Sequence, residues 1–167
     1  PVIDYYKKLD FDFDRDPFKK ISVEYISLYN EKSLTSKLQH GALETIDFFK
    51  SINFRHIVIS AMEQQTLENQ IKKNSIYSYF DSVIGLSNIY AHSKIENAQN
   101  FLKTNKHISS SDCIFIGDTY HDYEVAQALQ CSCYLVNNGH QNLNRFSFND
   151  SVKIFNNLSE ISKFYKY

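Results

Sequence analysis

The chain has 167 residues, with 18 Lys plus Arg against 19 Asp plus Glu, and 43% of its residues are apolar. This length and composition fit one ordinary soluble domain with its own core. A formal net charge of -1 supplies no general positive field for nucleic acid. No apolar run approaches the roughly 20 residues needed to cross a bilayer. We therefore expect a cytoplasmic protein whose partners are neither nucleic acids nor membranes.

The first predicted elements are helices. Asp16 followed by Pro17 is a typical helix start, and the apolar residues after it predict a helix over about residues 17–31. A second helical pattern covers residues 42–50. It leads into a short apolar run at residues 55–60, which is typical of a buried strand.

After this first strand, helical and strand patterns alternate along the chain. We predict helices at about 62–73, 94–104, 121–129 and from Ser159, and strands at about 82–86, 113–118, 131–136 and 152–155. Strands that alternate with helices are typical of a parallel sheet in an α/β fold.

The cysteines do not fit a disulfide framework or a zinc site. Their number is odd, and no second Cys or His pair follows Cys131 and Cys133 at a zinc-site spacing. We expect these two residues and Cys113 to be buried, unreactive thiols.

Polar residues follow or lie close behind three of the predicted strands. Ser60 ends the first strand, Lys94 begins the helix after the second, and Asp118 follows the third. Ligands of an open parallel sheet bind outside the carboxyl ends of its strands, so these side chains are expected to meet at one edge. The Ser60 hydroxyl and the Ala61 backbone N–H can donate to phosphate oxygens, and Lys94 can neutralise charge. Asp118 offers hard oxygens to Mg²⁺, and Asp122, one helical turn later, can add a second carboxylate ligand.

Each of these residues also has a purely structural explanation. Ser60 could cap the helix that follows it, and a single lysine such as Lys94 is usually a solvated surface charge. Asp118 and Asp122 could cap and charge the first turn of the helix at 121–129. The joint arrangement favours a phosphate and metal site over these separate explanations.

The order of these residues resembles that of the haloacid dehalogenase-like hydrolases, nearest to their phosphoglycolate phosphatase-like branch. The run ending in Ser60, the Ser93-Lys94 pair and the stretch 114–122 resemble the second, third and fourth motifs of that family. The most specific piece is Gly-Asp-Thr-x-x-Asp, which ends at Asp122. The resemblance covers about residues 40–165.

The resemblance implies a Rossmann-like, three-layer α/β fold with a parallel sheet and the remnant of a helical cap. It implies a magnesium-dependent phosphatase that acts on a small phosphorylated metabolite through an aspartyl-phosphate intermediate. By motif, Ser60 would bind the transferring phosphoryl group and Lys94 would stabilise its charge. Asp118 would hold Mg²⁺, with Asp122 as a supporting acidic residue. The physical logic agrees, because phosphoryl transfer depends mainly on positioning and charge neutralisation.

The motif that carries the nucleophile in this family, an apolar strand followed by Asp-x-Asp, has no clear counterpart upstream of Ser60. The run from Asp10 to Asp14 has the spacing but does not follow a buried strand. We therefore expect residues 1–35 to be the C-terminal part of a helical cap and residues 36–167 to be an α/β core without its first strand. The nucleophilic aspartate would then lie outside this chain.

In the family, the missing strand lies between the strands that end in Ser60 and Asp118. Without it, both inner strands would carry unpaired backbone edges. We expect the chain alone to be unstable or to associate with its missing N-terminal segment. The alternative is a degenerate family member that binds a phosphorylated ligand or a protein partner without hydrolysing it. A nucleotide-binding or receiver-like domain is not favoured, since the chain has neither G-x-G-x-x-G nor a Walker sequence.

Overall fold

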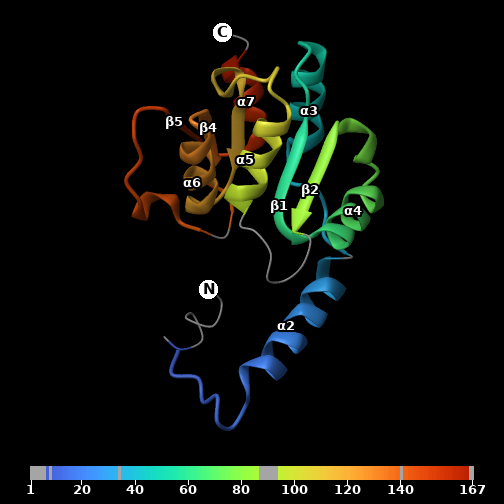
Figure 1. The fold of residues 1–167 in the computed structure, drawn as a ribbon, viewed down its shortest axis with the longest axis vertical. Helices are drawn as coiled ribbons and strands as arrows, with labels where there is room; N and C mark the ends of the chain where they lie inside the picture. Colours follow the sequence, from blue (N-terminus) through green and yellow to red (C-terminus); the bar gives the residue numbers. More distant parts are fainter. Residues whose placement is uncertain (1–6, 8, 34, 87–93, 140, 166–167) are drawn as a thin grey trace. The chain divides into compact units, whose positions relative to one another are not determined.

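The structure is a computed structural model, and it describes residues 7, 9–33, 35–86, 94–139 and 141–165. The chain forms two compact units, Pro1–Lys37 and Leu38–Tyr167 (Figure 1). Within these described ranges, no helix is both long enough and apolar enough to cross a membrane.

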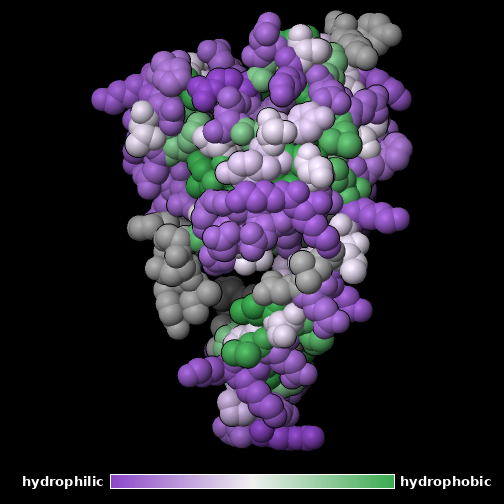
Figure 2. All heavy atoms as spheres, turned by 90° about the vertical axis from the view of Figure 1, so that its right-hand side faces the viewer, coloured by the Kyte–Doolittle hydropathy of each residue, from purple (hydrophilic) through white to green (hydrophobic). Residues whose placement is uncertain are grey.

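The smaller unit contains helix α2, Phe18–Ser33, close to the predicted bounds. A turn precedes it, in which the Asp12 carboxylate accepts the backbone N–H groups of Asp14 and Arg15 at 3.0 and 3.1 Å. The Asp10–Asp14 run is therefore not a strand. Figure 2 shows hydrophobic side chains on the surface of this unit. The large apolar residues of α2 that are exposed are Val23, Tyr25, Ile26, Leu28 and Tyr29.

The larger unit alternates strands and helices as predicted. Its elements are α3 (Ala42–Ser51), β1 (Ile57–Glu63), α4 (Gln64–Lys73), β2 (Ser82–Leu86), α5 (Lys94–Thr104), β3 (Ile114–Gly117), α6 (Tyr120–Leu129), β4 (Ser132–Val136), β5 (Val152–Phe155) and α7 (Leu158–Tyr165). Three short 3₁₀ turns join them, at Tyr77–Tyr79, Ser110–Asp112 and Leu143–Arg145.

Strand β1 runs three residues further than predicted, and the reason is the cap of α4. The Glu63 carboxylate accepts the backbone N–H groups of Gln65 and Thr66 at 2.9 and 2.8 Å, which satisfies the first turn of the helix. Ser60 therefore does not cap α4, and the capping explanation for this serine is wrong.

All described strand pairs are parallel, but they form two sheets instead of one. Strand β1 pairs with β2, and β3, β4 and β5 form the second sheet in that order. The division falls between β1 and β3, the strands expected to lack a neighbour. Among the described residues, no strand precedes Ile57.

The core confirms a three-layer arrangement around β4. Tyr134 and Val136 pack with Phe49 of α3 and Ile161 of α7. The alternate residues of β4 pack on the opposite side, in a cluster with Ala126 of α6. Because successive side chains of a strand point to opposite faces, helices cover both faces of this sheet.

All three cysteines are free thiols, as predicted, and Cys131 and Cys133 are buried. Cys113 is only partly buried, so the prediction of burial was wrong for this residue. Burial raises the pKa of Cys131 to about 11 and that of Cys133 to about 12. Since the thiolate is the reactive form, both residues are suited to packing and not to chemistry.

Candidate active site

The Gly-Asp-Thr-x-x-Asp stretch forms the connection between β3 and α6. Thr119 is the N-cap of α6, and its hydroxyl accepts the backbone N–H of Asp122 at 3.2 Å. In return, Asp122 Oδ2 accepts the Thr119 backbone N–H at 2.9 Å. This reciprocal pair is a capping box, which explains why this spacing starts a helix directly after the strand.

Asp122 is also paired with Lys94. Lys94 Nζ, at the first residue of α5, lies 2.5 Å from Asp122 Oδ1. The two side chains are 15% and 5% exposed, so water screens the pair only weakly. Burial by itself raises the pKa of Asp122, but the Lys94 ammonium and the hydrogen bonds to the carboxylate outweigh it and hold the pKa below its usual value.

The second carboxylate oxygen of Asp122, Oδ2, accepts hydrogen bonds from the turn between β3 and α6. Oδ2 accepts the backbone N–H of Asp118 at 3.0 Å and the Thr119 hydroxyl at 2.8 Å, besides the Thr119 N–H. With Lys94, four donors therefore meet the roughly four lone-pair positions of one carboxylate. Asp122 links α5, the end of β3 and the start of α6.

Two glycines make room for these carboxylates. A Cβ atom at Gly117 would lie 2.2 Å from Cγ of Asp122, and one at Gly139 would lie 2.1 Å from Oδ2 of Asp118. Neither approach is compatible with a side chain. Gly117 thus belongs to the motif for a steric reason.

Asp118 lines a cavity of about 220 Å³ at the carboxyl end of β3. Two amides share this cavity, and Asn138 Nδ2 donates to Gln39 Oε1 at 3.4 Å. Neither amide was predicted from the sequence. Asn138 follows strand β4 closely, so the rule that found Asp118 also points to it, whereas Gln39, before α3, carries no such signal.

Ser60 and Ala61 lie within β1, in the other sheet, and the strand continues to Glu63, so Ser60 does not end the strand as predicted. The Ser60 hydroxyl accepts the Met62 backbone N–H at 3.1 Å, and Ala61 is exposed. Within the described part of the chain, no hydrogen bond joins Ser60 to the Lys94–Asp122 pair. The structure thus brings Lys94, Asp118 and Asp122 together, and Ser93 lies outside the described residues.

The donor set suits Mg²⁺ better at Asp118 than at Asp122. A carboxylate with amide oxygens nearby offers the hard ligands that Mg²⁺ prefers. No group of three His, Cys, Asp or Glu residues gathers among the described positions. Mg²⁺ is usually held by one or two carboxylates, waters and a substrate phosphate, which Asp118 fits. Coordination by Asp122 would displace one of its four donors.

In this three-layer α/β fold, one lysine and two aspartates lie around the carboxyl end of β3. Such a set of groups suits a phosphate group and a divalent cation. Residues 2–136 match the haloacid dehalogenase-like hydrolases, and the chain belongs to this family. No curated protein matches the sequence.

Several solved structures share this fold at low sequence identity. A predicted phosphatase from Clostridium acetobutylicum has a TM-score of 0.77 at 19% identity, over 98% of this chain and 76% of that one. A predicted phosphoglycolate phosphatase from Haemophilus somnus has a TM-score of 0.73 at 18% identity, over 96% and 72%. A haloacid dehalogenase-like family hydrolase from Streptococcus pneumoniae has a TM-score of 0.72 at 16% identity, over 96% and 86%.

Proposed function

We propose that the chain acts in a magnesium-dependent phosphatase that hydrolyses a small phosphorylated metabolite, such as phosphoglycolate or a sugar phosphate. In the first step a carboxylate oxygen bonds to phosphorus, the ester P–O bond breaks, and the leaving alkoxide takes a proton from solvent water to become the alcohol. Water then hydrolyses the aspartyl-phosphate. The nucleophilic aspartate comes from outside this chain, and residues 1–35 are the C-terminal part of a helical cap.

The observation that carries the proposal is the partly buried Lys94 ammonium, fixed by Asp122 beside Asp118. An ammonium has three donors, and Asp122 takes one, so two can serve phosphate oxygens. A cation held in place before the substrate arrives needs no reorganisation as charge develops during transfer. Family membership and the phosphatases of similar fold support the same chemistry.

The other residues take roles that follow from their positions. Asp118 would hold Mg²⁺, which when bound supplies charge neutralisation at the phosphate oxygens. The Ser60 hydroxyl and the Ala61 N–H would bind the phosphoryl group from the side of β1. Asp122 positions Lys94 and the Asp118 turn, with its metal ligation as a secondary proposal.

Hydrolysis is tested by adding the nucleophilic aspartate to the chain as part of a synthetic peptide. Phosphate release from phosphoglycolate and from a panel of sugar phosphates is measured for the full chain with and without Mg²⁺. Each assay is run alone and with a synthetic peptide that consists of an apolar strand followed by Asp-x-Asp. We expect release only with both the peptide and Mg²⁺, and none when Asn replaces the first Asp of the peptide. Ester binding is followed in parallel by calorimetry.

Asp118→Asn tests the metal assignment. We expect it to lower magnesium-dependent release severely and to weaken the dependence of ester binding on Mg²⁺, because it removes a charge that faces the metal. Asp150→Asn, at an exposed position, is the matched control and leaves both unchanged. Unchanged turnover in Asp118→Asn contradicts the assignment.

The alternative function is binding of a phosphorylated ligand or a protein partner without hydrolysis. The absence of a strand before Ile57 in the described residues favours it. Ester binding that depends on Lys94, with no release under any of the conditions above, would select this alternative. Loss of binding in Lys94→Ala but not in Lys72→Ala would locate the ligand.

A further inference from the structure

The turn after β4 contains the sequence Asn138-Gly139, and both residues lie beside the candidate site. Asn138 is exposed and lines the Asp118 cavity. Gly139 approaches Asp118 so closely that a Cβ atom on this glycine would lie 2.1 Å from Oδ2 of the aspartate. A chemical change at this Asn-Gly step would therefore act directly on the surroundings of Asp118.

The atoms that an asparagine needs for cyclisation are accessible at this step. An asparagine cyclises when the backbone nitrogen of the next residue attacks its side-chain carbonyl carbon, Cγ. Among the described residues, no hydrogen bond engages the Gly139 backbone N–H. The Asn138 amide makes one hydrogen bond to a described residue, and this bond is long, at 3.4 Å from Nδ2 to Gln39 Oε1. Glycine also has no Cβ to hinder the attack.

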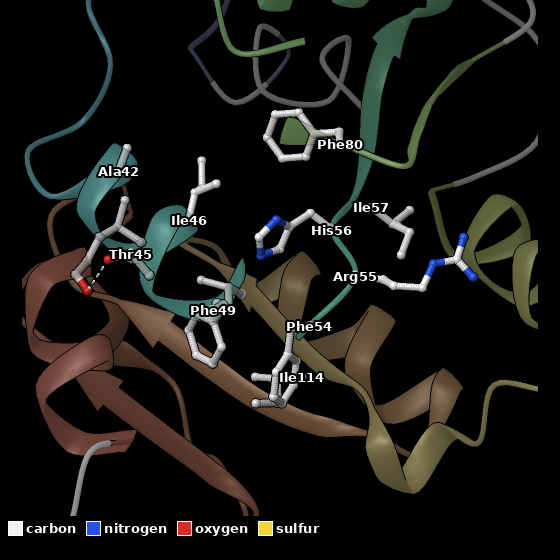
Figure 3. Close-up of a pocket in the computed structure, with 12 residues that line it drawn as sticks. Ala42, Thr45, Ile46, Phe49, Phe54, Arg55, His56, Ile57, Phe80 and Ile114 are labelled. Carbon is white, nitrogen blue, oxygen red and sulfur yellow. Dashed lines mark hydrogen bonds between the residues drawn. The ribbon is translucent and has the colours of Figure 1, made fainter. Parts of the chain in front are cut away.

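Two other asparagines show how the fold can block the same reaction. After Asn53, the Phe54 N–H donates to the Phe49 carbonyl oxygen at 2.9 Å, and the two rings pack with centroids 5.2 Å apart at the cavity drawn in Figure 3. After Asn74, the Ser75 N–H donates to a carbonyl oxygen of α4 at 2.9 Å. A nitrogen held in this way attacks only after local opening of the structure. Among the described residues, nothing gives the Asn-Gly step this protection.

We propose that Asn138 is a site of self-modification, at which the candidate site acquires a second carboxylate. The Gly139 nitrogen bonds to Cγ of Asn138 and loses its proton, the Cγ–Nδ2 bond breaks, and ammonia leaves with that proton. The resulting succinimide adds one water molecule and opens. Opening at one carbonyl gives aspartate, and opening at the other gives isoaspartate, in which the backbone runs through the former side chain. Either product has a carboxylate in place of the neutral amide.

The new carboxylate changes what the Asp118 cavity binds. One or two carboxylates usually hold Mg²⁺ in proteins, and a second negative charge a few ångströms away attracts the ion further. We expect the converted chain to bind Mg²⁺ about tenfold more tightly. This second step rests on the proposed function, in which Asp118 holds Mg²⁺, whereas the cyclisation depends on the turn alone.

Conversion is measured by peptide mapping with mass spectrometry. The full chain is incubated in mildly alkaline buffer made with water enriched in heavy oxygen, and the same incubation in urea gives the rates for the unfolded chain. We expect Asn138 to convert in the native chain with uptake of heavy oxygen, and Asn74 to convert at least about tenfold more slowly than it does in urea. Equal protection of the two asparagines by the native fold, or an Asn138 that stays intact, would overturn the proposal.

Three variants test the chemistry and its effect on the metal. Asn138→Gln should not convert on the same time scale, because glutamine would have to close a larger ring. Asn138→Asp has the aspartate product from the start, and we expect calorimetry to show about tenfold tighter Mg²⁺ binding than in the wild type. Asn144→Asp adds the same charge at an exposed position that does not line the cavity, and leaves Mg²⁺ binding unchanged. Equal Mg²⁺ affinities of the two aspartate variants would overturn the effect on the metal.

This proposal and the proposed function fail separately. If Asp118→Asn leaves Mg²⁺ binding unchanged, the metal assignment falls, and the conversion of Asn138 found by peptide mapping still stands. If Asn138 stays intact in the native chain while Asp118→Asn weakens Mg²⁺ binding, the self-modification falls and the metal assignment stands.

Discussion

Lys94 and Asp122 form a charge pair between the first residue of α5 and the first turn of α6, with Nζ and Oδ1 separated by 2.5 Å. The pair is almost fully shielded from water, and the Lys94 Nζ also lies 5.2 Å from the centre of the Phe115 ring. Two helices, a strand end and the candidate site therefore depend on one ion pair.

Removing the lysine charge should destabilise the fold as well as the site. Lys94→Met keeps most of the side chain's length but leaves the Asp122 carboxylate buried without its counter-ion, which typically costs about 3 kcal/mol. The measurement is the free energy of unfolding in urea. Lys72→Met is the matched control, because Lys72 and Glu68 form a more exposed pair at 2.9 Å, where water screens the charges and a much smaller loss is expected. Equal losses in the two variants would contradict the buried pair.

The lowered pKa of Asp122 predicts a loss of stability in acid. A carboxyl whose pKa is lower in the folded state stabilises the protein above its unfolded-state pKa, near 4, and this contribution disappears as the pH falls through the folded-state pKa. Urea unfolding is measured from about pH 6 downward. We expect the stability of the wild type to fall more steeply below about pH 4 than that of Asp122→Asn. Parallel curves for the two proteins would show that Asp122 is not the group responsible.

Gly117→Ala tests the close approach of β3 to Asp122. The added methyl group would lie 2.2 Å from Asp122 Cγ, so the carboxylate or the strand must shift. We expect a loss of about 1 to 3 kcal/mol and a weaker Lys94–Asp122 pair. Thermal unfolding gives the first quantity, and the acid dependence above gives the second. Ser132→Ala, at an exposed strand position, is the control. An unchanged melting temperature in Gly117→Ala would argue against this packing.

Thiol reactivity should follow burial. At pH 8, with pKa values of about 11 and about 12, Cys131 and Cys133 carry almost no thiolate in the folded protein. We expect a thiol reagent to modify at most Cys113 in the native chain, slowly, and all three thiols in urea. In Cys113→Ser the native reaction should vanish. Rapid modification of Cys131 or Cys133 would contradict their place in the core.

The sequence predicted the candidate site best at positions where one residue both starts a helix and carries a functional group of the site. Asp122 could be predicted because its spacing from Gly117 and Thr119 both starts a helix and resembles a family motif, and Lys94 because it begins a helix. Glu63 as the cap of α4 was missed, because Ser60 satisfies the same preference three residues earlier.

Other features depend on contacts between distant segments. Gln39 reaches the Asp118 cavity from before α3, and Gln64 Oε1 accepts the Gly85 backbone N–H at 2.6 Å. No local pattern contains either contact. The sequence predicted unpaired edges on β1 and β3, because no apolar strand pattern precedes residue 55, but it did not predict that the strands would separate into two sheets.

The two kinds of contact at Asp122 also differ in how far apart they lie along the chain. Its bonds to Asp118 and Thr119 span four and three residues, whereas its bond to Lys94 spans 28. Short loops close far faster than long ones. During folding, the turn should therefore orient the Asp122 carboxylate first. Lys94 should then pair with a carboxylate that is already in place. A defect in the turn would thus delay the docking of α5 onto α6.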